Sequence, residues 1–132
     1  MNKEELEKIK KKALEEHIPI LMDDTLEVIE KQLKEKPPKR ILEIGAAVGY
    51  SAMCFSEFLA AGGKIDTIER DEERIKEAKI NFKNVGVEEK IKYIIFLDLN
   101  KNIMNFWYIK KVSVFALILL FYSTNSQSIS NF

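Results

Sequence analysis

The stretch R-I-L-E-I-G-A-A-V-G-Y-S at residues 40–51 decides the fold of this 132-residue chain. Its apolar part predicts a buried strand over 41–44, which runs into a turn of small residues containing Gly45 and Gly49. A helix is predicted to begin near Tyr50. Glycines at the end of a strand allow a ligand to approach the backbone, and the following helix directs unpaired N–H groups toward that ligand. The stretch therefore predicts a nucleotide-binding site.

The residues of this turn exclude two common kinds of phosphate site. A dinucleotide-binding turn has the pattern G-x-G-x-x-G, whereas Gly45 and Gly49 give G-x-x-x-G. A P-loop carries G-K-[ST] after its second glycine, whereas Tyr50 and Ser51 follow here. Glu43, two residues before the first glycine, can accept hydrogen bonds from a cationic or amino-bearing ligand.

These residues resemble the first motif of the class I S-adenosylmethionine-dependent methyltransferases. The version E-x-G-x-x-x-G-Y-S at residues 43–51 is most similar to the small O-methyltransferases of the catechol, caffeoyl-CoA and bacterial tRNA hydroxyuridine type. The resemblance implies a Rossmann-like α/β fold with parallel strands and flanking helices, of which this chain would hold the N-terminal part and an incomplete C-terminal half. It implies S-adenosylmethionine as the cofactor, with contacts from Glu43, Gly45, Gly49, Tyr50 and Ser51.

A second strand is predicted over 64–68, and Glu69 follows it. Glu69 lies 24 residues beyond Gly45, about where a βαβ unit places the acid whose carboxylate accepts both ribose hydroxyls. The alternative is that Glu69 caps the next helix. Asp71 is also placed to cap that helix, which is expected to stop at Gly86.

The resemblance implies two further cofactor contacts. Met22, in the segment that begins at Pro19, would approach the methionyl end of the cofactor; the alternative is that Met22 is a core residue. Asp98 follows a third predicted strand over 91–97, where the family has an acid that meets the adenine amino group. The family places a glycine before this acid, and here Leu97 replaces it.

Three further helices are expected around the first strand. The first, over 3–16, carries four apolar residues at helical spacing: Leu6, Ile9, Ala13 and Leu14. The second runs to about Lys34, and Asp24 with Glu27 would form its capping box. The helix after the glycine turn is expected to end at 61–63. His17 follows the first helix as a capping or surface residue, and no catalytic base is identified.

Composition favours one soluble domain, because 46% of the residues are apolar and 32% are charged. A formal net charge of zero provides no field to steer nucleic acid. One cysteine, Cys54, excludes a disulfide framework and a cysteine zinc site and suggests a reducing compartment. The Lys/Glu-rich start has no apolar signal segment, so the cytoplasm is the expected location.

The end of the chain differs from the rest, because all 21 acidic residues lie at or before Asp98. We expect one partial domain over 1–122 and a loose polar tail over 123–132. The apolar run at 112–122 is expected to form a buried strand beside the first strand; the alternatives are disorder or aggregation, and a membrane segment, for which the run is short. We hypothesise that the sequence after residue 98 is frameshifted or ended early.

The resemblance, which covers residues 10–98, implies methyl transfer to a hydroxyl of a small molecule or a tRNA nucleoside. It also implies Mg²⁺, whose ligands should lie after residue 110, where the chain has no acid; no metal ligand is therefore assigned. The first interpretation is a truncated O-methyltransferase with impaired catalysis. The alternatives are a non-catalytic binding or interaction module and a dinucleotide-dependent oxidoreductase, against which the glycine spacing argues. We expect no membrane partner, and self-association through the open edge of the first strand.

Overall fold

The structure is a computed structural model that describes residues 1–95 and 120–122. Asp98 and the polar tail at 123–132 therefore lie outside the described residues. The elements follow in the order α1 (Lys3–Glu15), α2 (Asp23–Glu35), β1 (Arg40–Ile44), α3 (Tyr50–Phe55), the 3₁₀ helix η1 (Ser56–Phe58), β2 (Lys64–Glu69), α4 (Glu72–Val85), β3 (Ile91–Ile95) and β4 (Leu120–Tyr122).

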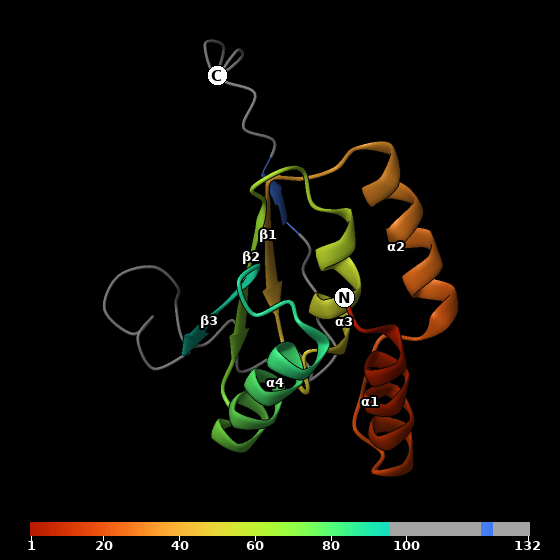
Figure 1. Cartoon of the computed structure of the whole chain (residues 1–132), viewed down its shortest axis with the longest axis vertical. Helices are drawn as coiled ribbons and strands as arrows, with labels where there is room; N and C mark the ends of the chain where they lie inside the picture. The colour runs from red at the N-terminus through yellow and green to blue at the C-terminus, as the bar shows by residue number, and fades with distance from the viewer. Residues whose placement is uncertain (96–119, 123–132) are drawn as a thin grey trace, which may run out of the picture.

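The sheet has the strand order β3-β2-β1-β4 (Figure 1). β1 pairs with β2 in parallel, with Glu43 opposite Thr67, and β2 pairs with β3 in parallel, with Thr67 opposite Tyr93. The predicted parallel α/β arrangement is therefore confirmed for these three strands.

A strand lies beside β1, as expected from the apolar run at 112–122. This strand is β4, at residues 120–122; residues 112–119 of the run lie outside the described residues. β4 runs antiparallel to β1, with Leu42 opposite Leu120, unlike the parallel strands of the rest of the sheet. An apolar run indicates burial in a sheet and contains no information on the direction of the strand.

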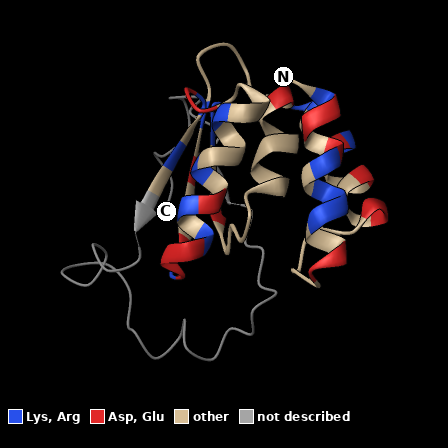
Figure 2. Cartoon of the chain, turned by 60° about the horizontal axis from the view of Figure 1, so that its bottom comes forward, with Lys and Arg blue, Asp and Glu red and all other residues tan. Residues whose placement is uncertain are grey.

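Helices α1 to α4 lie on one side of the sheet (Figures 1 and 2). Side chains alternate along a strand, so Ile41 and Glu43 point to the same face as their partners Ile65 and Thr67. That face is buried under the helices: Ile41 is 1% exposed, and Ile65 and Glu43 are fully buried. The outer surfaces of the helices carry charges of both signs (Figure 2).

Local signals fix both ends of α4 as predicted. Asp71 is the N-cap, and its Oδ1 accepts hydrogen bonds from the backbone N–H groups of Glu73 at 2.9 Å and Arg74 at 3.2 Å. Gly86 ends the helix in the left-handed conformation with φ 76°.

Three details of the other helices differ from the prediction. The prediction that Asp24 and Glu27 form a capping box for α2 is wrong. Met22 is the N-cap, and the Asp24 side chain accepts from the neighbouring N–H of Thr25 at 2.6 Å. Leu14 is not in the core but 50% exposed. The helix α3 ends at Phe55 instead of 61–63, because the Ser56 hydroxyl bonds the Met53 carbonyl at 2.7 Å and the chain tightens into η1.

Candidate functional site

The turn between β1 and α3 depends on left-handed backbone conformations. Gly45 has φ 92° and Gly49 has φ 82°, and Ala47 between them has φ 46°, which L residues rarely adopt. A Cβ on Gly49 would overlap the ring of Phe82 on α4. The turn is therefore held close to α4, and its shape requires glycine at Gly49 for both conformation and space.

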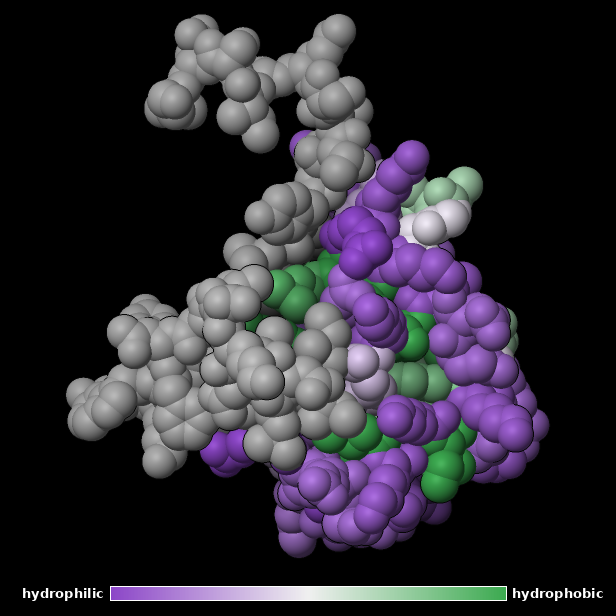
Figure 3. Space-filling model, turned by 90° about the vertical axis from the view of Figure 1, so that its left-hand side faces the viewer, coloured by the Kyte–Doolittle hydropathy of each residue, from purple (hydrophilic) through white to green (hydrophobic). Residues whose placement is uncertain are grey.

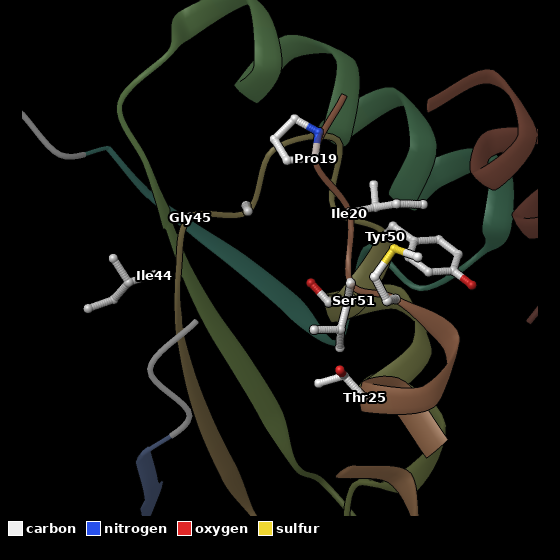
Figure 4. A pocket seen from close by; sticks show the side chains of 10 residues that line it. Pro19, Ile20, Thr25, Ile44, Gly45, Tyr50 and Ser51 are labelled. Carbon is white, nitrogen blue, oxygen red and sulfur yellow. The ribbon is translucent and has the colours of Figure 1, made fainter. Parts of the chain in front are cut away.

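A pocket of about 230 Å³ opens beside this turn, at the carboxyl end of β1 (Figure 4). Its walls come from the segment between α1 and α2, the first turn of α2, the end of β1, the glycine turn and the first residues of α3. The lining residues are Pro19, Ile20, Leu21, Met22, Thr25, Ile44, Gly45, Ala46, Tyr50 and Ser51.

Four of the predicted site residues line this pocket: Met22, Gly45, Tyr50 and Ser51. Met22 is 63% exposed, so the alternative that it is a core residue is wrong. The segment reaches the pocket because the chain reverses after α1, where His17 has φ 55° and the Ile18 N–H donates to the Ala13 carbonyl at 2.8 Å. The exposed position of His17 at this helix end agrees with its prediction as a capping or surface residue.

Glu43 lies behind the pocket wall and does not line the pocket. Its side chain is fully buried; Oε1 accepts from the Ser51 hydroxyl at 2.5 Å, and Oε2 accepts from the Thr67 hydroxyl at 2.5 Å. Burial raises the pKa of Glu43, and these two hydrogen bonds oppose that rise. The carboxyl expected to meet the ligand therefore has two protein partners and no exposed surface.

Glu69, the last residue of β2, forms a hydrogen bond with the same turn. Its Oε2 accepts from the Ala47 N–H at 2.9 Å, and its Oε1 accepts from the N–H groups of Arg70 at 2.7 Å and Asp71 at 3.1 Å. The alternative that Glu69 is the N-cap of α4 is wrong, because Asp71 is the N-cap. Glu69 stands at the tip of β2 beside the turn, although it does not line the pocket.

Sequence reasoning missed two buried residues that support the site. Thr67 is fully buried and bonds Glu43, and Asn81 on α4 donates from Nδ2 to the Val48 carbonyl at 2.9 Å. A threonine on an apolar strand and an asparagine on the apolar face of a helix were the available signals, because a buried polar side chain requires a partner.

The pocket offers hydroxyl groups and no group that titrates near neutral pH. Its polar side chains are Thr25, Tyr50 and Ser51, and burial raises the pKa of the Tyr50 phenol above its ordinary range. Burial also raises the pKa of the nearby Cys54 thiol to about 12, which keeps the thiol protonated. Among residues 1–95 and 120–122, no three His, Cys, Asp or Glu side chains cluster as metal ligands, and no helix is long and apolar enough to cross a bilayer.

Known proteins that resemble this chain are methyltransferases. A family model described as O-methyltransferase matches residues 4–121. By sequence, the chain is 32% identical over 63 residues to a protein-L-isoaspartate O-methyltransferase from Methanopyrus kandleri, over 48% of this chain and 28% of that protein.

Solved structures with a similar fold include two O-methyltransferases. A candidate caffeoyl-CoA O-methyltransferase from Staphylococcus aureus is 31% identical with a TM-score of 0.64, over 74% of this chain and 49% of that chain. An O-methyltransferase from Bacillus cereus, solved in complex with S-adenosylhomocysteine, is 21% identical with a TM-score of 0.65, over 74% and 45%. The chain spans about half the length of these two proteins.

The family match is longer than the motifs alone indicated. It runs from residue 4 to residue 121, whereas the motifs cover residues 10–98. It includes both helices before β1, the glycine turn and the three parallel strands. Since this match covers most of the 132 residues, the chain belongs to the O-methyltransferase family.

Proposed function

We propose that this chain binds S-adenosylmethionine, with the amino-acid end in the pocket and the ribose at Glu69, as the cofactor of methyl transfer to a hydroxyl oxygen. The observation that carries the proposal is the pocket itself, which joins the glycine turn to the hydroxyl of Ser51 at the carboxyl end of a parallel strand. The Bacillus cereus relative, whose structure contains S-adenosylhomocysteine, supports the same ligand class.

The size of the pocket suits part of this ligand. Sites that enclose a whole ligand measure about 300–1,000 Å³, and this pocket measures about 230 Å³. The hydroxyls of Thr25 and Ser51 and the backbone at Gly45 supply polar contacts for an amino-acid group. Met22 and Ile20 supply apolar surface for the chain of methylene groups beside the sulfur.

The carboxylate of Glu69 is suited to a ribose, because it accepts hydrogen bonds. Three backbone N–H groups already bond its two oxygens, and a carboxylate offers about four acceptor positions. One free position on Oε2, together with a shift of the Ala47 contact, would accommodate the two ribose hydroxyls. In this proposal Gly49 shapes the turn, and Asp98, beyond the described residues, would meet the adenine.

The chemistry of transfer needs an aligned acceptor and a base. When bound, the sulfonium would supply the methyl group: a nucleophilic oxygen would attack the methyl carbon, the C–O bond forming as the C–S bond breaks, with S-adenosylhomocysteine as the leaving group. The lining residues bind and orient, and none of them is a base near neutral pH. The described residues also contain no cluster that fits the Mg²⁺ expected from the resemblance, so no step is assigned to a metal.

A second candidate function is cofactor binding without turnover, in a binding or interaction module. It is favoured because the only polar side chains that line the pocket are hydroxyls, and none of them is a base near neutral pH. The two candidates differ in one measurement, methyl transfer to a hydroxylated acceptor, such as a catechol or a tRNA, with Mg²⁺ added. Transfer above the rate without protein supports the enzyme, and binding without transfer supports the module.

Calorimetric titration with S-adenosylhomocysteine and, separately, with NAD tests the binding proposal. We expect saturable binding of S-adenosylhomocysteine and none of NAD, because the glycine spacing differs from the dinucleotide pattern. Binding of NAD alone would support an oxidoreductase and reject the proposal.

A further inference from the structure

A second cavity of the molecule is lined almost entirely by helix residues. It is a groove of about 480 Å³ whose sides come from α1 and α2 and whose floor includes α3 and η1. Both α1 and α2 pack against α3 (Figure 1). The volume lies in the range of about 300–1,000 Å³ that is typical of small-molecule sites. The groove is separate from the pocket at the glycine turn, since Tyr50 alone lines both.

The floor of this groove is apolar. Leu6 of α1 is 8% exposed, Leu26 of α2 is 9% exposed, and Cys54 of α3 is 5% exposed. Phe58 adds an aromatic ring, and the Nζ of Lys34 lies 5.0 Å from the centre of that ring, a distance at which a ring face attracts a cation. A ligand of the groove therefore gains from an apolar body.

The rim of the groove carries an excess of negative charge. Three lysines and five acidic residues line the groove, which leaves two negative charges without a counterpart. The ion pairs on the rim are Lys10–Asp23 at 2.6 Å, Lys3–Glu57 at 3.9 Å and Lys34–Glu30 at 4.0 Å. Within the part of the chain that the structure describes, Glu7 of α1 and Glu27 of α2 have no lysine or arginine within 4.0 Å. The rim thus offers two carboxylates to a cation, whereas its lysines already have partners.

A buried hydroxyl lies beside these carboxylates. Tyr50 is 3% exposed, and its oxygen points away from the pocket at the glycine turn (Figure 4). The groups around the phenol include the Cys54 thiol, which bonds weakly, and the carboxylates of Asp23 and Glu7. Burial raises the pKa of the Tyr50 phenol, and these negative neighbours raise it further, so the phenol stays neutral. Its oxygen keeps lone pairs that accept a hydrogen bond from an ammonium group.

We propose that this groove is a second ligand site, which binds a small organic cation made of an ammonium group on an apolar body. The body lies on Leu6 and Leu26, and the ammonium lies between the carboxylates of Glu7 and Glu27. The Tyr50 hydroxyl is the third acceptor. The inference goes beyond the proposed function and does not rest on it, because the acceptors of the groove are not those of the pocket at the glycine turn.

The alternative is a solvated groove, in which Glu7 and Glu27 only keep the surface charged. The two accounts differ in their dependence on ligand charge. A solvated groove binds a cation no more tightly than a neutral molecule of the same shape, whereas a cation site prefers the cation and disfavours an anion.

The test uses three probes that share an aromatic body and differ in charge: phenethylamine, phenethyl alcohol and phenylacetate. Titration of the isotope-labelled full chain without cofactor, followed by amide chemical shifts in NMR, measures both the affinity and the residues affected. We expect phenethylamine to bind about two- to tenfold more tightly than phenethyl alcohol, the range of two exposed ion pairs, and phenylacetate to bind most weakly. The shifts should fall at Leu6, Leu26 and Cys54.

Charge-neutral variants identify the carboxylates. Glu7→Gln and Glu27→Gln change exposed side chains, so the fold is kept. Each should weaken phenethylamine about two- to fivefold and leave phenethyl alcohol unchanged. Glu35→Gln is the matched control, because it makes the same change of charge at an exposed position of α2 outside the groove, and it should bind phenethylamine as the wild type does.

Four outcomes would overturn the inference. They are no binding of any probe, equal binding of phenethylamine and phenethyl alcohol, an equal loss of phenethylamine binding in Glu35→Gln, and amide shifts confined to Gly45 and Ala46 of the first pocket. The titration contains no S-adenosylhomocysteine, so the proposed function is retained or rejected separately from this inference.

Discussion

Gly49 meets two constraints, of which Gly62 shares only the left-handed backbone conformation. Its φ is 82°, and a Cβ there would overlap the Phe82 ring, whereas Gly62 has φ 72° and open space around the same position. We expect Gly62→Ala to cost about 1 kcal/mol, for the backbone conformation alone. Gly49→Ala should cost about 2–4 kcal/mol, because the side chain must also displace the ring. Urea unfolding of both variants measures the difference. Equal losses in unfolding free energy would show that the Phe82 ring on α4 moves aside without an energetic cost.

The burial of Glu43 predicts a pH dependence of stability. Burial raises the pKa of Glu43, and the groups facing it are the Ser51 and Thr67 hydroxyls, the Glu69 carboxylate and the Tyr93 phenol. A carboxyl whose pKa is raised on folding does not lower the free energy of unfolding while it is protonated in both the folded and the unfolded state. The free energy of unfolding then falls as pH rises from the pKa of the unfolded state to that of the folded state.

Glu43→Gln removes this titration and keeps a polar side chain of the same shape. We therefore expect the stability of Glu43→Gln relative to wild type to improve between about pH 5 and about pH 8 in thermal melts. Glu27→Gln, at an exposed position on α2, is the control and should follow the wild type at both pH values. A difference between Glu43→Gln and wild type that stays constant with pH would contradict the raised pKa.

At the scale of elements, two aspartates near helix starts have different roles. Asp71 caps α4 through two backbone N–H groups, whereas Asp24 Oδ1 accepts from a single residue, Thr25, through its backbone N–H and its hydroxyl. We expect Asp71→Ala to cost about 0.5–2 kcal/mol of unfolding free energy. Asp24→Ala is the matched control and should stay within about 0.5 kcal/mol of wild type. If Asp24→Ala proved the more costly change in chemical denaturation, the reassignment of the α2 cap to Met22 would be wrong.

Local signals were sufficient for the centre of the fold. The strand, the glycine turn and the start of α3 follow from residues 40–51, because each depends on neighbours in the sequence. The same holds for α4, whose two ends are fixed by Asp71 and Gly86. The lining of the pocket by Met22 and Ser51 needed the family resemblance in addition, since the two residues lie in separate elements.

Features that depend on distant partners could not be predicted. Glu43 is absent from the pocket lining because its carboxyl is enclosed by the hydroxyls of Ser51 and Thr67. Thr67 lies 24 positions further along the chain, and in the sequence it is recognisable only as part of an apolar strand. The antiparallel direction of β4 likewise depends on how the chain returns to β1. Hydrophobic periodicity reports which residues are buried, and it does not report which buried polar groups find one another.

At the scale of the whole molecule, the described residues cover one face of the sheet more completely than the other. The helices cover the face of Ile41 and Glu43, whereas Leu42 and Ile44 on the other face are partly exposed. On the side shown in Figure 3, hydrophobic residues appear between the hydrophilic ones of the described surface. Leu42 and Ile44 lie on β1, close to the edge where β4 pairs.

That edge predicts self-association. β4 pairs with Arg40–Leu42 and leaves Glu43 and Ile44 without a strand partner on that side in the described part of the chain. Unpaired edge groups beside apolar side chains are a template for another strand. We expect the mass measured by light scattering to rise with protein concentration. Ile44→Lys should reduce this rise, because a lysine at a strand edge opposes pairing.

Val28→Lys provides the matched control for the edge. Val28 is 59% exposed on α2, away from β1, so its replacement adds the same charge without altering the edge. If both lysine variants reduced the association equally, the added net charge and not the β1 edge would be the cause. A positive net charge makes copies of the chain repel one another, whichever residue carries it. If the wild type kept the monomer mass at every concentration, the remaining partners of β1 would have to come from the same chain, and the edge would be closed within the monomer.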